Sequence, residues 1–205
     1  MVAIAPSFSP GSSSNAPRAL TATALLDTLE RALHSSKSEW LFLRELRTGT
    51  GHRNNFAQRL DAFALNCLPH QAMRRVCYEV KLSRADFLGE LKQPLKSRIG
   101  MRYSNEFYFV TPGDLVKPCE IPVDCGLIEI GTAAFEEWKV LMKKQAGFFW
   151  FDPPSQTYCL MTVPACWRDT PGPSWQFTAA MLRNQRRQFE ERPPLPPKQQ
   201  RLELA

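Results

Sequence analysis

The chain has no run of apolar residues close to the roughly 18–20 that a membrane-spanning helix needs. Its first residues, from Met1 to Pro6, also lack the apolar core of a signal peptide. These two absences argue against a membrane protein and against secretion. We therefore expect a cytoplasmic protein without a membrane partner.

Closely spaced cysteine pairs are missing as well. Six cysteines stand at positions 67, 77, 119, 125, 159 and 166, and no two of them form a C-x-x-C pair. A zinc site built on Cys67, His70 and Cys77 would lack a fourth ligand at a usual spacing. Reduced thiols that act as small apolar side chains are the better interpretation. The other two histidines, His34 and His52, suggest no catalytic triad.

The composition is that of a globular protein with a basic balance. The 205 residues are 43% hydrophobic and 22% charged, which suits one well-buried domain. A net charge of +6 favours a polyanionic partner. Residues 1–18 are rich in Ser, Pro, Gly and Ala and are predicted to be disordered, and residues 192–205 are predicted to form a Pro-rich extended tail. We expect one domain over residues 19–191. A homodimer and protein partners bound through the tails are compatible with this organisation.

Apolar periodicity predicts an α/β domain with a central mixed sheet flanked by helices. Helices are predicted over residues 21–33, 38–47 and 175–191, and two more over 84–91, capped by Ser83, and 94–103. Strands are predicted over residues 58–65, 76–81, 106–111, 126–130 and 138–143. The aromatic segment 146–168 predicts an accessory hairpin, in which Phe148 to Phe151 belong to the core or form a stacking platform for DNA.

The stretch from Val76 to Lys81 carries the strongest chemical signal. Strand alternation places Glu79 and Lys81 on one face of an otherwise apolar strand. If the preceding loop centres on His70, paired residues have numbers that sum to 140, and Asp61 lies opposite Glu79. A divalent cation would convert the repulsion of these two carboxylates into ligation, and oxygen ligands suit Mg²⁺. The alternative is a solvent-facing ion pair on an edge strand.

Residues 60–130 resemble the PD-(D/E)XK nuclease superfamily, and within it the MmcB-type DNA-repair nuclease family. Asp61 followed by Glu79-Val80-Lys81 matches the D…(E)xK arrangement, although Leu60 stands where the superfamily motif has proline. The matching blocks are 78–87 (YEVKLSRADF), 107–112 (FYFVTP) and 126–130 (GLIEI), in that order.

The resemblance implies a restriction-endonuclease-like core and a metal-dependent deoxyribonuclease that acts in DNA repair, recombination or mobile-element biology. Asp61, Glu79 and the carbonyl of Val80 would hold Mg²⁺, with Mn²⁺ as a substitute. Lys81 would orient or deprotonate the attacking water, or stabilise the developing charge.

Further residues receive supporting roles from the same resemblance. Glu45, on the predicted helix 38–47, is a candidate for an additional acidic ligand or simply part of a polar helix face. Gln58, Ser83 and Asp86 would fix the ligands in place, and Asp86 is also a helix-capping residue. Contacts to the phosphate backbone of DNA are predicted for Arg84, Lys92, Lys96, Arg98, Arg102 and Tyr103, unless these form an ordinary solvated face.

Two other functions remain open. One is a catalytically silent nuclease fold that binds DNA or serves as a scaffold, and the other is a nuclease directed at RNA. The sequence does not distinguish an endonuclease from an exonuclease.

Overall fold

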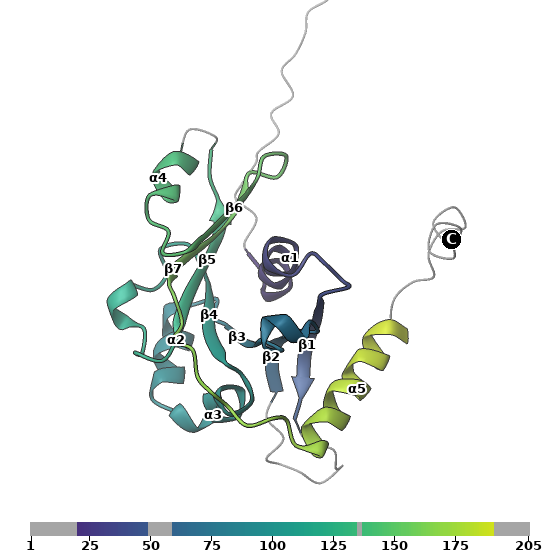
Figure 1. The fold of residues 1–205 in the computed structure, drawn as a ribbon. Coiled ribbons are helices and arrows are strands. Elements are labelled where there is room, and N and C mark those ends of the chain that lie inside the picture. The colour runs from purple at the N-terminus through teal and green to yellow at the C-terminus, as the bar shows by residue number, and fades with distance from the viewer. Residues whose placement is uncertain (1–19, 49–58, 135–136, 191–205) are drawn as a thin grey trace, which may run out of the picture.

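The computed structural model describes residues 20–48, 59–134 and 137–190, with the side chains of 94–97 left out. Both predicted tails and Gln58 lie outside this part of the chain. The described strands form one sheet (Figure 1). They are β1 (Trp40–Arg47), β2 (Arg59–Asn66), β3 (Arg75–Val80), β4 (Glu106–Pro112), β5 (Gly126–Thr132), β6 (Phe148–Asp152) and β7 (Thr157–Val163). The helices are α1 (Ala22–Leu33), α2 (Arg84–Leu91), α3 (Pro94–Tyr103), α4 (Trp138–Met142) and α5 (Trp175–Glu190).

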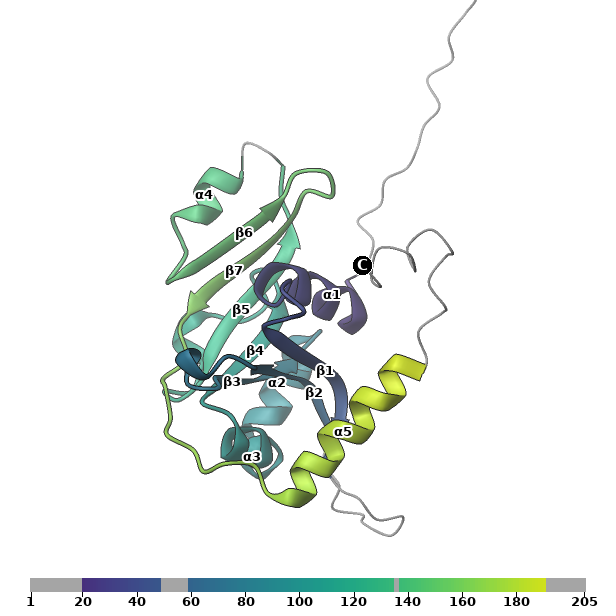
Figure 2. The same ribbon diagram turned by 45° about the vertical axis from the view of Figure 1, so that its right-hand side comes forward.

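The sheet has seven strands in the order β1-β2-β3-β4-β5-β7-β6. The three central strands β3, β4 and β5 run parallel to one another, and every other neighbouring pair is antiparallel. Helices cover both faces of this sheet (Figure 2). The prediction of an α/β domain with a central mixed sheet flanked by helices is confirmed.

The two faces of the sheet bury separate apolar clusters. One face packs against α1, through Leu25 and Leu29 of that helix, and the other packs beneath α2 and α5, through Phe87 and Phe177. The α3 helix lies on the second face too, close to β3, because Gly100 has no side chain: a Cβ there would meet the Sγ of Cys77 at 2.7 Å. The second face, called the α2 face below, carries the candidate site.

A buried aromatic and polar cluster lies on the α1 face. The ring nitrogen Nε2 of His34 lies 2.8 Å from the Tyr78 hydroxyl, whereas Nδ1 of the same ring has no hydrogen-bond partner among the described residues. Burial, followed by the charges of Arg74 and Lys37, lowers the pKa of His34 to about 3. The imidazole is therefore neutral at physiological pH.

The prediction of a helix over residues 38–47 is wrong, because this segment forms strand β1. Phe42 packs on the α1 face, while Leu43 and Leu46 both pack on the α2 face. Two residues three apart share a face because Glu45 between them has a φ of 50°, which breaks the strand alternation. A strand buried on both faces with such an irregularity produces the apolar spacing of a helix.

The prediction of a strand over residues 138–143 is also wrong, because Trp138 to Met142 form the short helix α4. Trp138 stacks on Phe149 at a centroid distance of 6.4 Å, and Leu141, one turn later, packs on the same side. Five residues are too few for periodicity to separate a helix from a strand.

The aromatic hairpin is present as β6 and β7, and it is an integral part of the sheet. β7 pairs with β5 from Leu127↔Val163 to Thr132↔Thr157, so the hairpin completes the central sheet instead of standing apart from it. Phe149 packs in a buried cluster with Leu160. This supports the core interpretation of the aromatic segment.

Candidate active site

The β2–β3 hairpin has the register that the loop centred on His70 predicts. A turn of 3₁₀-helix over Pro69–Gln71 closes the loop. The observed partners all have numbers that sum to 140: Ala62↔Tyr78, Phe63↔Cys77, Ala64↔Val76 and Leu65↔Arg75. One step further along this register, Asp61 lies beside Glu79. The main-chain N–H of Val80 donates a 2.9 Å hydrogen bond to Oδ2 of Asp61, which fixes that carboxylate against the end of β3.

Lys81 follows β3 directly and is almost entirely buried, with 4% of its surface exposed. Its main-chain N–H donates to the carbonyl of Val110 at 2.9 Å, which continues the pairing with β4. Its side chain points to the α2 face, where Nζ lies 2.8 Å from Oε1 of Glu79. Asp61, Glu79 and Lys81 therefore come together at one point of the sheet.

The helix after β3 adds two more carboxylates around the same ammonium. Oε2 of the buried Glu90 lies 3.1 Å from Nζ of Lys81, and Oδ1 of the exposed Asp86 lies 3.8 Å from it. The helix begins where predicted, because the Ser83 hydroxyl accepts a 3.2 Å hydrogen bond from the N–H of Asp86. Sequence reasoning missed Glu90. The signal for it was its spacing of four residues from Asp86, which places both acids on one side of a helix.

The carboxylates outnumber the cation, and their electrostatics reflect this. Burial, and then the charge of Asp61, raise the pKa of Glu79 to about 7, even though Lys81 acts in the opposite direction. Burial also raises the pKa of Asp61, against the effects of the Val80 N–H and of Lys81. The pKa of Lys81 is raised as well, because Glu79 and Glu90 together outweigh its burial. The site thus holds a protonated lysine among carboxylates that repel one another.

The oxygen atoms next to Asp61 form a donor set that suits a hard cation. Within a strand, the N–H and C=O of one residue point to the same side. Since the N–H of Val80 points at Asp61, we expect its carbonyl on that side too, as a third oxygen beside the carboxylates of Asp61 and Glu79. The described part of the chain contains no group of three or more His, Cys, Asp or Glu side chains placed to hold a metal ion. The donor set beside Asp61 has only two such side chains and one main-chain oxygen.

Glu45 lies on β1, not on a helix, which corrects the predicted setting of this residue. The β1–β2 pairs on either side of it, Arg44↔Ala62 and Leu46↔Leu60, place it across from Asp61. Its side chain is exposed, and Oε2 lies 3.8 Å from Nη1 of Arg59. Its role as an additional ligand remains a prediction.

The predicted phosphate-binding residues lie on α2, on α3 and, in the case of Lys92, between these two helices. Lys92, Arg98 and Arg102 are exposed, and the side chain of Lys96 lies outside the described part. Arg84 is also exposed, and its Nη1 lies 2.9 Å from Oε2 of Glu120.

Tyr103 has a packing role in addition to any contact with a ligand. Its ring stacks on Phe177 of α5 at 4.3 Å, and its hydroxyl lies 3.2 Å from the hydroxyl of Ser174. Tyr103 therefore joins α3 to α5, which makes it less accessible than Arg84, Lys92, Arg98 and Arg102.

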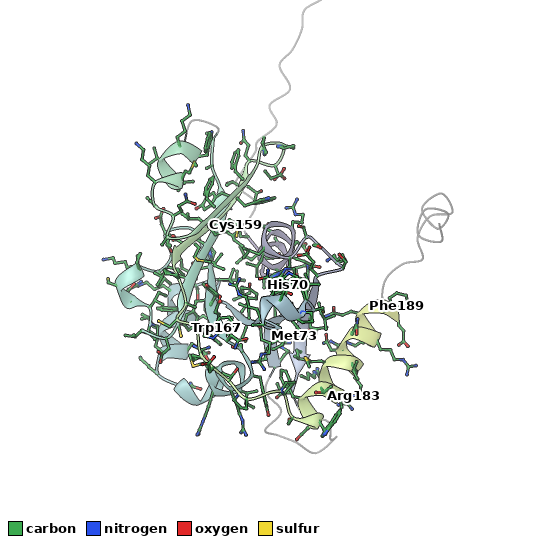
Figure 3. The ribbon with its side chains drawn as sticks, viewed as in Figure 1. His70, Met73, Cys159, Trp167, Arg183 and Phe189 are labelled. Carbon is green, nitrogen blue, oxygen red and sulfur yellow. The ribbon has the colours of Figure 1, made fainter. Side chains whose placement is uncertain are left out.

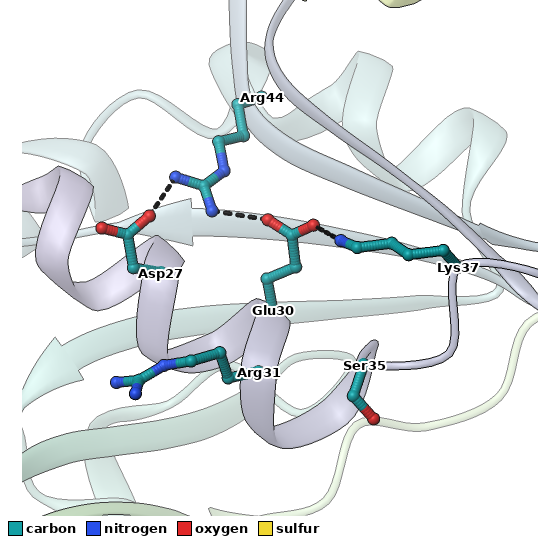
Figure 4. Close-up of a pocket in the computed structure, with 6 residues that line it drawn as sticks. All are labelled: Asp27, Glu30, Arg31, Ser35, Lys37 and Arg44. Carbon is teal, nitrogen blue, oxygen red and sulfur yellow. Dashed lines mark hydrogen bonds and ion pairs between the residues drawn. The ribbon is translucent and has the colours of Figure 1, made fainter. Parts of the chain in front are cut away.

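A separate open pocket of about 580 Å³ lies between α1, the segment after it and β1 (Figure 4). Its charged groups already have partners: Arg44 bonds both Asp27 and Glu30 at 2.5 Å, Lys37 also pairs with Glu30, and Arg31 lies 3.6 Å from Asp152 of β6. None of the predicted site residues lines this pocket. Because all five of its charged side chains have ion-pair partners, we do not place the chemistry there.

No protein-family model matches the chain, and no curated protein matches it. A solved structure with a similar fold is that of SPO1766, a protein of unknown function from Silicibacter pomeroyi. The two structures have a TM-score of 0.51 and 14% sequence identity, over 81% of this chain and 86% of that one. At this identity the likeness concerns the fold alone. No described helix has both the length and the apolar character to cross a membrane.

Proposed function

We propose that the protein is a Mg²⁺-dependent nuclease that hydrolyses phosphodiester bonds of DNA, in DNA repair, recombination or mobile-element biology. The proposal includes a restriction-endonuclease-like core of the PD-(D/E)XK type. The observation that carries it is the meeting of Asp61 on β2 with Glu79 and Lys81 at the end of β3, across the β2–β3 hairpin.

A structural ion pair does not account for this arrangement. A lysine needs one carboxylate partner to be neutralised, yet Lys81 has Glu79 and Glu90 within 3.1 Å and Asp61 nearby. Partly buried carboxylates in excess are costly unless a further cation compensates them. Strongly perturbed pKa values of this kind cluster at functional sites.

Each residue has a role that follows from its position. Asp61, held by the Val80 N–H, and Glu79 would bind Mg²⁺ together with the Val80 carbonyl. When bound, Mg²⁺ would polarise the scissile phosphate and lower the pKa of a bound water. Lys81 would place its ammonium beside the phosphate and stabilise the negative charge that builds up during hydrolysis. Glu90 and Ser83 would keep Lys81 and α2 in position.

Exposed cations on the same side of the sheet as the site support an anionic polymer as the substrate. Arg98 and Arg102 lie on α3, and Lys92 lies between α2 and α3, so three exposed positive charges border the α2 face. Contacts of this kind bind the phosphate backbone irrespective of base sequence. We therefore expect binding that depends strongly on salt concentration.

The test is a panel of labelled single-stranded, duplex and branched DNA and RNA, incubated with Mg²⁺ or Mn²⁺. The parent protein is expected to cleave DNA, whereas Glu79→Ala and Lys81→Ala are expected to bind it without cleavage. Asp27→Ala, a carboxylate on the other face of the sheet, is the matched control and should cleave like the parent.

Other outcomes contradict the proposal in distinct ways. DNA binding without cleavage by the parent protein would favour a catalytically silent fold, and selective cleavage of RNA would favour an RNA nuclease. Cleavage by Glu79→Ala and Lys81→Ala at the parent rate would show that the chemistry occurs elsewhere.

A further inference from the structure

Three large apolar side chains of α5 are exposed to solvent. Trp175, Leu182 and Phe189 have 89%, 61% and 76% of their surface exposed. They recur every seven residues, so they lie along one side of the helix, which we call the α5 stripe. Figure 3 shows Phe189 near the C-terminal end of α5, at the periphery of the described structure.

The opposite side of α5 already fixes the helix to the sheet. Phe177, Ala180 and Met181 are buried in the apolar cluster beneath it. The side-chain amides of Asn184 and Gln188 donate hydrogen bonds of 3.0 and 2.9 Å to the carbonyl of Arg44 on β1. The α5 stripe therefore contributes nothing to the packing of this helix on the sheet. Large apolar side chains that are exposed along one side of a helix in this way are typical of interaction sites.

We propose that the α5 stripe is a homodimer interface in which the α5 helices of two copies pack antiparallel. The spacing is symmetrical, because Trp175 and Phe189 each lie seven residues from Leu182. A two-fold axis near Leu182 would place Leu182 against its counterpart in the second copy and Trp175 against Phe189 of the second copy. Self-complementarity of this kind is what a two-fold interface requires.

The distribution of charge along α5 favours the same antiparallel arrangement. The first half, from Trp175 to Leu182, contains no charged residue, and the second half contains three arginines and one glutamate. A parallel pair would bring the two arginine-rich halves together. In an antiparallel pair, each arginine-rich half lies beside the uncharged half of the second copy. The sixteen residues of α5 span about 24 Å, enough for all three apolar layers.

The first experiment measures the mass of the full chain in solution by light scattering over a range of concentrations. The parent protein is expected to have twice the mass of the 23.4 kDa chain, and Leu182→Glu is expected to have the mass of one chain. Val140→Glu changes an apolar side chain on α4 with a similar exposure of 60% and should remain dimeric. Circular dichroism and thermal unfolding confirm that each variant is folded, and Phe189→Glu is a second variant near the helix end.

The second experiment tests the antiparallel geometry by disulfide formation, in a background where the exposed Cys67, Cys119 and Cys166 are serine. Leu182→Cys is expected to cross-link to itself. Trp175→Cys is not, but it is expected to cross-link to a Phe189→Cys chain when the two are mixed.

If the parent protein has the mass of one chain at all concentrations, the proposal is wrong. The same result is expected if residues 191–205 cover the α5 stripe in place of a second copy. A dimer that survives Leu182→Glu would place the interface elsewhere. Self-linking of Trp175→Cys would overturn the antiparallel arrangement. This proposal does not depend on the nuclease activity, because none of these experiments measures cleavage.

Discussion

The ammonium of Lys81 lies 3.1 Å from Oε2 of Glu90, a buried carboxylate two turns along the next helix. This contact joins the end of β3 to α2. Because Glu79 binds the same ammonium from the strand side, Lys81 is held between two elements and has little freedom to move. An immobile lysine is what a pre-organised site requires.

We predict that Glu90→Gln lowers kcat for DNA cleavage by about tenfold, the lower end of the range for residues that orient catalytic groups. The amide retains a hydrogen-bond acceptor but loses the charge that holds Lys81, which lowers kcat. Glu90 is buried and has no predicted contact with DNA, so KM should change little. Steady-state kinetics on a labelled duplex measure both constants. Glu39→Gln, an exposed carboxylate far along the chain from the site, is the control, and an unchanged kcat in Glu90→Gln would remove its positioning role.

A second prediction concerns pH and Glu79. Its folded-state pKa of about 7 lies above the ordinary value of 4.5, so the folded protein binds this proton more tightly than the unfolded chain. The free energy of unfolding should therefore fall as the pH rises from about 4.5 to about 7, by at most about 3 kcal/mol from this group. Glu79→Gln has no carboxyl at this position and therefore lacks this contribution to the pH dependence of stability.

Urea denaturation at a series of pH values tests this difference. The stability of Glu79→Gln relative to the parent should increase through that window and then stay level. A constant difference between the two proteins would show that Glu79 has an ordinary pKa.

A third prediction concerns Mg²⁺. If Asp61 and Glu79 bind the ion, Mg²⁺ at ten times its Kd should stabilise the fold by about 1.4 kcal/mol. At a fixed Mg²⁺ concentration the gain should be larger above pH 7, where Glu79 is ionised, because protons and Mg²⁺ compete for the same oxygen atoms. Thermal unfolding with and without Mg²⁺ measures this gain. Asp61→Asn should abolish it and Asp27→Asn should not; equal gains in both variants would place the ion elsewhere.

A fourth prediction concerns the buried pair of His34 and Tyr78. Tyr78→Phe removes the partner of Nε2, and Nδ1 already lacks one among the described residues. Leaving a buried polar atom unpaired costs about 1–3 kcal/mol, which chemical denaturation would detect. The matched control is Tyr103→Phe, whose hydroxyl bonds an exposed serine and whose loss should cost about 0.5 kcal/mol or less. Equal losses in the two variants would contradict the importance of the buried pair.

Much of the candidate site was predictable because it depends on local rules. Alternation in β3 and the length of one hairpin loop were sufficient to place Asp61 beside Glu79. The cap of α2 at Ser83 follows from residue type and spacing. These features involve residues close in sequence, so their geometry depends little on the rest of the sheet.

The errors occurred where tertiary structure overrides local pattern. The φ of 50° at Glu45 gives β1 a helical apolar spacing, and no residue type in that segment signals it. Glu90 was missed because its role depends on how α2 packs against Lys81. The sheet position of β7 was missed because pairing with β5 joins segments far apart in sequence.

The contact of α5 with β1 has a consequence for synthesis of the protein. Asn184 and the Arg44 carbonyl that it binds are separated by 140 residues, which a ribosome adds in on the order of ten seconds. During that time Leu43 and Leu46 have been made but the helix that covers them has not. The β2–β3 hairpin can close early, whereas this apolar edge remains a target for chaperones until the last helix emerges.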